Sequence, residues 1–95
     1  MLNLPNTFGK YKCPCCRFYT LEREAGNTFQ LCFVCYWEDD GIQLLDEDYE
    51  GGANAISLRQ ARFNFQAYGA IDCKFITVVR RPLFYEQPSI LDFDH

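Results

Sequence analysis

The stretch KYKCPCCRFYT, residues 10–20, places three cysteines within four positions and sets the interpretation of the rest of the chain. Cys13 and Cys16 are separated by two residues, a spacing that lets one tight turn present both sulfurs to a single metal ion. A second pair with the same spacing, Cys32 and Cys35, follows after fifteen residues. The pattern C-x2-C-x15-C-x2-C is typical of structural zinc sites, so we predict one Zn²⁺ held by these four thiolates.

The residues between the two pairs indicate how the four sulfurs come together. RFYTLE (17–22) and TFQL (28–31) are short β-prone runs, and AGN (25–27) between them has the composition of a turn. We therefore expect a β-hairpin that brings the second pair to the first and completes a tetrahedral, zinc-ribbon-like site. Four protein ligands leave no open coordination position, which makes the expected metal structural.

Cysteine pairs of this kind also occur in redox motifs and as buried thiols that bind nothing. A redox C-x-x-C is expected within a βαβ unit, which this sequence does not predict. Zinc binding contributes about 10–16 kcal/mol in small zinc-finger peptides, whereas a domain of this length is stable by about 5–14 kcal/mol in total. We therefore expect the metal to decide whether the first half of the chain folds.

Two cysteines lie outside the predicted ligand set. Cys15 sits within the first pair, at the apex of the turn, where we expect a small, soft side chain that fills space. The alternative is a spare thiol that exchanges with a ligand or triggers metal release on oxidation. Cys73 is expected to be a small buried hydrophobe. Lys12 and Arg17 flank the first pair and would offset part of the negative charge of four thiolates, with backbone N–H groups contributing more.

Six motifs follow one another along the chain: KCPCC (12–16), CYWEDDG (35–41), GGAN (51–54), SLRQARFNF (57–65), YGA (68–70) and VRRP (79–82). In this order and spacing the chain resembles the bacterial cysteine-rich CPCC family over roughly residues 8–86. The resemblance implies a small zinc-ribbon-like module without an established activity, whose members are often small bacterial proteins, some of them near toxin and immunity systems. Members usually have Gly where this chain has Arg17 and Pro where it has Phe33.

Residues 38–50, EDDGIQLLDEDYE, contain seven acidic side chains in thirteen positions. The simplest interpretation is a solvated loop. The alternative is a docking surface for a basic partner, because aromatic residues beside charges are typical of interface anchors. The candidate side chains are Trp37, Glu38, Asp39 and Asp40, although Trp37 next to a zinc turn would fit a core position equally well.

A helix is predicted over about residues 58–68. Ser57 and Gln60 have the spacing of a capping box, and Gly69 supplies the C-terminal stop. At about 100° per residue, the helix has one apolar stripe that should face the core. Its members are Leu58, Ala61, Phe65 and Tyr68.

Phe63 falls on the opposite side of this helix, close to Arg59. We expect another segment to cover Phe63, because a small aromatic-rich protein tends to bury its one helix on both sides. If Phe63 is exposed instead, Phe63 and Arg59 are the best candidates for a partner-binding patch.

The last third of the chain is the least regular. FITVV (75–79) is β-branched and apolar, which favours a strand. Asp72 would instead cap a short helix over the same region, and so short a run does not decide between the two. The tail FYEQPSILDFDH (84–95) is expected to strap over the domain or to dock on a partner. His95 has no companion in sequence that would make it a metal ligand.

Length and composition predict one small α+β domain over residues 1–95. We divide it into a zinc-ribbon-like part at about 8–40, an acidic loop at 38–53, and a helical and C-terminal part at 54–95, which ends in the short strand or helix. The N-terminus has no apolar leader segment and no stretch is long enough for a membrane span, so we expect a cytoplasmic protein with reduced thiols and no membrane contact.

Charge and residue types narrow the function. The net charge is −4, and residues 1–52 hold nine acids against four bases, which disfavours nucleic acid as a partner. The one histidine leaves no base for a thiol or hydroxyl nucleophile, so we expect no enzymatic activity. The leading hypothesis is a non-enzymatic zinc module that binds another protein. Its more specific form is an immunity or antitoxin protein that blocks a basic toxin.

A nucleic-acid-binding zinc ribbon is the competing class. It would require four arginines to converge into one basic footprint. These are Arg59, Arg62, Arg80 and Arg81.

Overall fold

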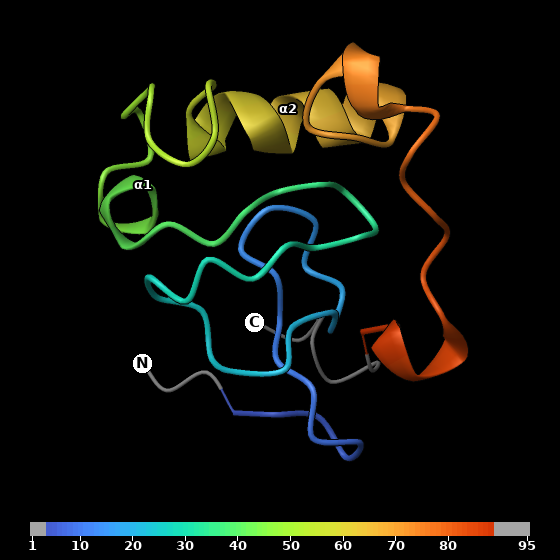
Figure 1. The fold of residues 1–95 in the computed structure, drawn as a ribbon. Helices are drawn as coiled ribbons and strands as arrows, with labels where there is room; N and C mark the ends of the chain where they lie inside the picture. Colours follow the sequence, from blue (N-terminus) through green and yellow to red (C-terminus); the bar gives the residue numbers. More distant parts are fainter. Residues whose placement is uncertain (1–3, 89–95) are drawn as a thin grey trace.

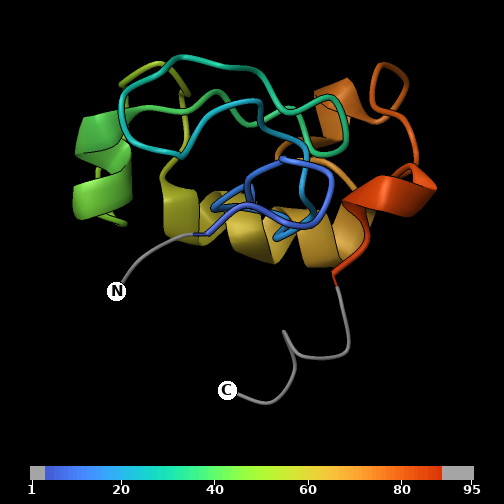
Figure 2. The same cartoon turned by 90° about the horizontal axis from the view of Figure 1, so that it is seen from below.

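The computed structural model describes residues 4–88. These residues form two α-helices, α1 (Gly41–Leu45) and α2 (Leu58–Tyr68), and two single-turn 3₁₀ helices, η1 (Cys73–Phe75) and η2 (Phe84–Glu86). Figure 1 shows α2 along one edge of the molecule, α1 at the side, and the cysteine-bearing segments coiled against them. In Figure 2 these segments lie along the length of α2. None of the helices in the described part is long and apolar enough to cross a membrane.

The cysteine-bearing segments form two small loops in place of the expected zinc-ribbon hairpin, and residues 4–88 contain no β-sheet. Two isolated antiparallel bridges are present, Tyr11 with Leu21 and Leu31 with Glu38. Each bridge closes a loop that carries one cysteine pair, and we call these loops the first knuckle (residues 11–21) and the second knuckle (residues 31–38). The expected pairing was therefore wrong, because the run after the first cysteine pair returns to the residues before that pair.

The run that was expected to form the second strand of the hairpin does not keep an extended backbone. Phe29 lies within this run and has a φ of 58°, outside the β region, after positive φ angles of 140° at Gly26 and 63° at Asn27 in the expected turn. Asp39 fixes the loop between the knuckles from the side. Its Oδ2 accepts hydrogen bonds from the backbone N–H groups of Gly26 (2.8 Å) and Thr28 (2.9 Å) and from the Thr28 hydroxyl (2.6 Å).

Helix α2 begins and ends where the sequence predicts. The Ser57 hydroxyl oxygen accepts a hydrogen bond from the Gln60 N–H at 3.1 Å. Gly69 ends the helix in the left-handed conformation, with φ of 84°, and its N–H donates to the Phe65 carbonyl at 2.8 Å. The Gln60 amide departs from the predicted capping box, since it turns along the helix and donates to the Asn64 side chain at 2.8 Å.

The buried face of α2 is shorter than the predicted stripe. Leu58 and Ala61 are completely buried and Phe65 is half-buried, as expected. Tyr68 is 52% exposed, so its assignment to the core was wrong. The chain turns at the helix end, and Ile71 enters the core there instead.

The segment after α2 forms turns where a strand seemed favoured. Asp72 caps η1, and its Oδ1 accepts a hydrogen bond from the Lys74 N–H at 3.1 Å, so the helical alternative holds for one 3₁₀ turn. A strand needs a neighbouring strand to pair with, and the described chain offers no sheet. Ile76 and Val78 are accordingly 45% and 54% exposed. Cys73 is also exposed, contrary to its expected burial.

The chain then straps back over the first knuckle. Arg80 holds the buried carboxylate of Glu86 with two hydrogen bonds of 2.7 and 2.8 Å, and the Glu86 carbonyl accepts one from the Tyr19 N–H at 2.8 Å. Burial alone would raise the pKa of Glu86, but the hydrogen bonds from Arg80 lower it overall. The predicted strap is thus present up to residue 88, and its remainder, with His95, lies outside the described residues.

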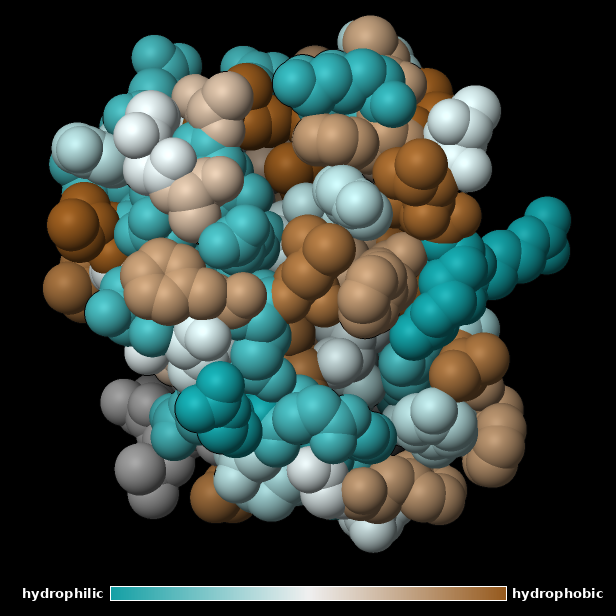
Figure 3. Space-filling model, viewed as in Figure 1, coloured by the Kyte–Doolittle hydropathy of each residue, from teal (hydrophilic) through white to brown (hydrophobic). Residues whose placement is uncertain are grey.

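Figure 3 shows hydrophobic and hydrophilic side chains interspersed over one face of this molecule.

Candidate metal centre

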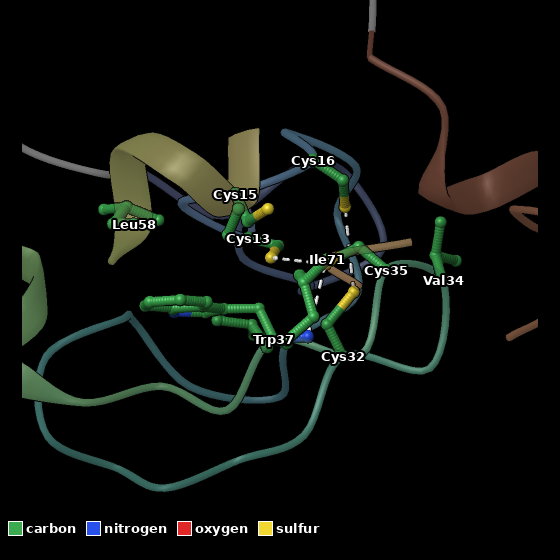
Figure 4. Packing of buried hydrophobic residues seen from close by; sticks show 11 residues of the cluster. Cys13, Cys15, Cys16, Cys32, Val34, Cys35, Trp37, Leu58 and Ile71 are labelled. Atoms are coloured by element: carbon green, nitrogen blue, oxygen red, sulfur yellow. Dashed lines mark hydrogen bonds between the residues drawn. The ribbon is translucent and has the colours of Figure 1, made fainter. Parts of the chain in front are cut away.

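Four of the six cysteines meet at one buried point. The sulfurs of Cys13, Cys16, Cys32 and Cys35 all lie within 4.8 Å of one another. The sulfurs of Cys13 and Cys35 are 3.7 Å apart, and so are those of Cys16 and Cys32. Four thiolates bound to one Zn²⁺ at tetrahedral angles would have sulfurs about 3.8 Å apart. Figure 4 shows the side chains approaching from two separate loops, so the predicted ligand set is brought together.

The two knuckles hold their cysteine pairs with matching backbone hydrogen bonds. In the first, the Arg17 N–H donates to the Cys13 carbonyl at 2.9 Å, and in the second the Tyr36 N–H makes the equivalent bond to Cys32 at 2.7 Å. The first cysteine of each pair donates in turn to the carbonyl five residues later, at 2.9 Å in both knuckles. The two-residue spacing therefore produces the same turn twice, and each turn directs two sulfurs to the centre.

The residue after each pair has a left-handed backbone, with φ of 70° at Arg17 and 77° at Tyr36. This conformation costs a residue other than glycine about 1–2 kcal/mol. Arg17, where the family resemblance led us to expect glycine, thus leaves the turn intact but strained. Phe33, the second departure, is 54% exposed at the tip of the second knuckle. Neither departure prevents the sulfurs from converging.

Within residues 4–88, two donors reach the sulfurs. The Thr20 hydroxyl donates to the Cys32 sulfur at 3.0 Å, and the Trp37 N–H donates to the Cys35 sulfur at 3.4 Å. Four thiolates around Zn²⁺ carry a net charge of about −2, and such donors disperse this charge and orient the ligands. A backbone donor was expected. A hydrogen bond from the Thr20 hydroxyl was not expected, because the sequence predicted a β-strand at this position.

Three cations lie close to the centre. Lys12, Arg17 and Arg62 line a hollow of about 190 Å³ beside Cys13. The Arg62 Nε donates to the Pro14 carbonyl at 2.9 Å, which joins α2 to the first knuckle. The predicted flanking of the site by Lys12 and Arg17 is therefore present, and Arg62, which also pairs with Glu47 at 2.9 Å, lies beside them.

The pKa values of Cys13, Cys32 and Cys35 are shifted in different directions when no metal is bound. Burial raises the pKa of Cys13 and Cys35 well above the ordinary range of a thiol. Hydrogen bonds from the other three thiols, and then from Thr20, hold the pKa of Cys32 far below that range. A metal ion must displace the protons that Cys13 and Cys35 retain, so metal binding weakens as the pH falls.

Cys15 is buried next to the centre without being one of the four clustered sulfurs. It is 4% exposed and belongs to the hydrophobic core. Figure 4 shows it close to α2 and to Cys13. A hydrogen bond with Cys15 is among the causes, after burial, that raise the pKa of Cys35. Its burial agrees with the expected space-filling role.

The predicted partner-binding residues divide into buried and exposed groups. Trp37 and Asp39 are each 1% exposed, and Asp40 is 6% exposed. Trp37 lies in the core below α2 (Figure 4). Asp39 fixes the loop between the knuckles, and the Asp40 Oδ1 caps α1 by accepting hydrogen bonds at 2.8 and 3.1 Å from its first turn. In this conformation these three side chains belong to the internal framework, whereas Glu38 is only partly buried.

Arg59 and Phe63 lie on the outer face of α2. Phe63 is 69% exposed, and no segment within residues 4–88 covers it. The Arg59 Nε pairs with an Asp48 oxygen at 2.7 Å, and its NH2 group lies 3.9 Å from Glu47. Phe63 is therefore available at the surface, whereas the charge of Arg59 is already offset by acids of the chain.

A polar network that the sequence did not reveal holds α1 in place. Gln43 is completely buried, and its Nε2 lies 2.9–3.1 Å from the carbonyls of Tyr49, Asn54 and Ile56. Its Oε1 accepts hydrogen bonds from the backbone and the side chain of Asn54 at 3.1 and 3.0 Å. Asn54 donates in turn to the Glu38 carbonyl at 2.8 Å. No pattern in the sequence distinguishes Gln43 from an exposed glutamine.

Comparison with known proteins supports the motif-based resemblance. The family model described as cysteine-rich CPCC matches residues 11–86, which include both knuckles, α1, α2 and the strap. No curated protein matches the chain. Because the family model covers most of the sequence and includes the four clustered cysteines, the chain belongs to the cysteine-rich CPCC family.

Proposed function

We propose that the protein is a non-enzymatic module that is folded around one structural Zn²⁺ and binds another protein. The observation that carries the metal assignment is the cluster of four buried sulfurs, all within 4.8 Å of one another. Tetrahedral sites of four cysteines are typical of structural zinc. Iron is the main competitor for such a site, and a metal analysis separates the two.

The geometry supports a structural role for the metal. Four protein ligands fill a tetrahedral shell, so neither water nor substrate can bind the ion without displacing a cysteine. Residues 4–88 contain no histidine, so this part of the chain supplies no imidazole base for thiol chemistry. These features favour a binding role over catalysis.

Ion pairs favour a protein partner over nucleic acid. Three of the four arginines that would form a basic footprint are paired with acids: Arg59 with Asp48, Arg62 with Glu47, and Arg80 with Glu86. These pairs reduce the positive potential that phosphate binding requires. An acidic protein that blocks a basic one, as an immunity or antitoxin protein does, is one form of the proposed role.

The metal assignment is tested on the purified full-length chain. Elemental analysis should find about one zinc per chain, because the four thiolates form one closed site. A chelator that removes the zinc should also remove the near-ultraviolet circular dichroism of the buried aromatic residues. Iron in place of zinc would overturn the identity of the metal, and a metal-free chain with an unchanged spectrum would overturn its structural role.

The partner class is tested by titrating labelled DNA and RNA with micromolar zinc-loaded protein at low salt. We expect no change in fluorescence anisotropy. Binding that weakens steeply with added salt would contradict the proposed protein partner and favour the nucleic-acid class.

A further inference from the structure

Helix α1 has two of its three apolar side chains on the outside, while the third, Leu44, is half-buried against the core. Ile42 is 59% exposed and Leu45 is 90% exposed, and their three-residue spacing puts them on the same side of the helix. The completely buried residue of α1 is Gln43. A surface helix ordinarily turns its apolar stripe to the core. Figure 3 shows hydrophobic side chains among hydrophilic ones at the edge where α1 lies in Figure 1.

A hollow adjoins these two side chains. It has a volume of about 470 Å³, and none of its lining residues is charged: Gly26, Asn27, Gly41, Ile42, Leu44 and Leu45. Glycine is required at position 41 in its wall, because a Cβ there would lie 2.9 Å from the Asn27 Cβ. The Gly41 N–H also donates to the Asn27 Oδ1 at 3.2 Å. The hollow is large enough to accept apolar side chains of a partner.

Hydrogen bonds within the chain fix the position of α1 and therefore the shape of this surface. A helix of five residues is not stable by itself in water, so α1 depends on its anchors. Gln43 ties it to the carbonyls of Tyr49, Asn54 and Ile56, and the Asp40 Oδ2 accepts a hydrogen bond from the Ala53 N–H at 2.8 Å. A surface fixed in advance loses less conformational entropy on binding.

The acidic charge around α1 favours a partner with a basic surface. Residues 38–50 contain seven acids and no base, and only Arg59 and Arg62 of the described residues form ion pairs with this segment. The segment has seven formal negative charges and two paired positive ones, which leaves an excess of five negative charges. Asp46, Asp48 and Glu50 are exposed directly after Leu45. Such a field attracts a basic surface and repels an acidic one, including a second copy of this segment.

We propose that Ile42, Leu45 and the adjoining hollow bind a basic amphipathic segment of another protein. Apolar side chains of that segment would enter the hollow, while its lysines and arginines would face the acids of residues 38–50. The inference rests on the proposed protein-binding role and gives it a surface. It also places the hydrophobic anchor on α1, in place of the buried Trp37.

A synthetic probe tests the surface directly. The probe is a fluorescent helical peptide of about 18 residues with leucine on one face and lysine on the other, and its matched control carries glutamate in place of lysine. The zinc-loaded full chain should bind the lysine peptide, more weakly as salt is added, and should not bind the glutamate peptide. Amide chemical shifts in the ¹H–¹⁵N spectrum should change mainly at residues 26–27 and 41–45.

Variants locate the site. Leu45→Ser and Ile42→Ser should each weaken peptide binding by about tenfold or more, as expected for anchor side chains. Phe63→Ser is the matched control, because it removes an exposed hydrophobic side chain on the outer face of α2, and it should leave the affinity unchanged. All three variants should keep the zinc content of the parent chain.

Three results would overturn the assignment to α1: absence of binding to the lysine peptide, shift changes centred on α2, or equal losses in Leu45→Ser and Phe63→Ser. With zinc still bound, each of these results leaves the structural metal role intact. Shift changes centred on α2 would keep the protein-binding role but move its surface. A parent chain without zinc would instead contradict the proposed function itself.

Discussion

At the scale of single residues, Arg17 occupies a backbone position that glycine adopts more easily. Its φ is 70° and its side chain is exposed, so substitution removes strain and little packing. Relief of the left-handed conformation gains about 1–2 kcal/mol, and the greater freedom of glycine in the unfolded chain costs about 0.5–1 kcal/mol. Arg17→Gly should raise the free energy of unfolding by about 1 kcal/mol, measured by urea denaturation with saturating zinc.

Tyr36→Gly is the control for this prediction. Tyr36 has a similar φ of 77°, but its ring packs on Phe75 with the ring centroids 4.6 Å apart. Loss of this aromatic contact should outweigh the relief of strain, so the variant should be less stable than the parent. Stabilisation by both variants, or by neither, would contradict the assignment of strain at Arg17.

Cys15 and Cys16 give opposite predictions although they are neighbours. The Cys16 sulfur belongs to the cluster of four, and that of Cys15 does not. Cys16→Ser should lose most of the bound zinc and unfold both knuckles. Cys15→Ser should keep about one zinc per chain and lose on the order of 1 kcal/mol of stability from a polar atom in the core. Equal zinc loss in the two variants, measured by elemental analysis, would mean that the ligand set is wrong.

The site residues that the sequence predicted correctly are those with a local geometric constraint. Two residues between cysteines leave few ways to direct both sulfurs to one point, so Cys13 and Cys16 could be chosen over Cys15. Cys73 has no such partner in sequence, and its expected burial was wrong. The role of Thr20 depends on a sulfur twelve residues away, and no rule of local sequence relates the two.

At the scale of elements, α1 should depend on one buried side chain. Gln43→Ala removes the amide that lies within hydrogen-bonding distance of three carbonyls, the buried one of Asn54 and the part-buried ones of Tyr49 and Ile56. Each buried polar group without a partner costs about 1–3 kcal/mol, so the variant should be destabilised by about 2–4 kcal/mol. Gln66→Ala, an exposed position on α2, should change stability by less than about 0.5 kcal/mol. Similar losses in urea denaturation would contradict the anchoring role of Gln43.

The prediction of elements succeeded where their signals are local. Ser57 and Gly69 fix the ends of α2 through contacts within one turn, and these ends were predicted correctly. The hairpin failed because Phe29, a residue type that favours strands, adopts a left-handed conformation that its side chain does not reveal. The proposed strand at 75–79 failed because β-propensity describes a side chain in a sheet, and the described chain forms no sheet.

At the scale of the whole molecule, stability should depend on pH through the metal. Burial raises the pKa of Cys13 and Cys35 well above their ordinary range, so these thiols are protonated when the metal is absent. Zinc binds the deprotonated forms, and protons therefore compete with it more strongly as the pH falls. Unfolding monitored by circular dichroism should coincide with zinc release in an acid titration, and excess zinc should move both midpoints to lower pH. Separate midpoints would contradict a shared transition.

The charge of the whole molecule could be read from composition, but its distribution could not. The acidic character of the first half predicted a surface for a basic partner. It did not show that Asp39 and Asp40 face inward, or that Glu47 and Asp48 lie beside arginines of α2. The proposed surface on α1 depends on this sorting of acids between the interior and the outside.

The two knuckles would also make the proposed metal a cross-link between separate stretches of chain. Trypsin cleavage after Arg23, an exposed residue in the loop between them, would leave one cysteine pair on each fragment. While zinc is bound, the nicked protein should migrate as one species on a native gel, and a chelator should let the fragments part. Fragments that stay together after complete zinc removal would show that packing alone suffices. If the fragments part only when zinc is removed, the ion joins the two peptides of this chain much as a disulfide would, but under the control of metal supply.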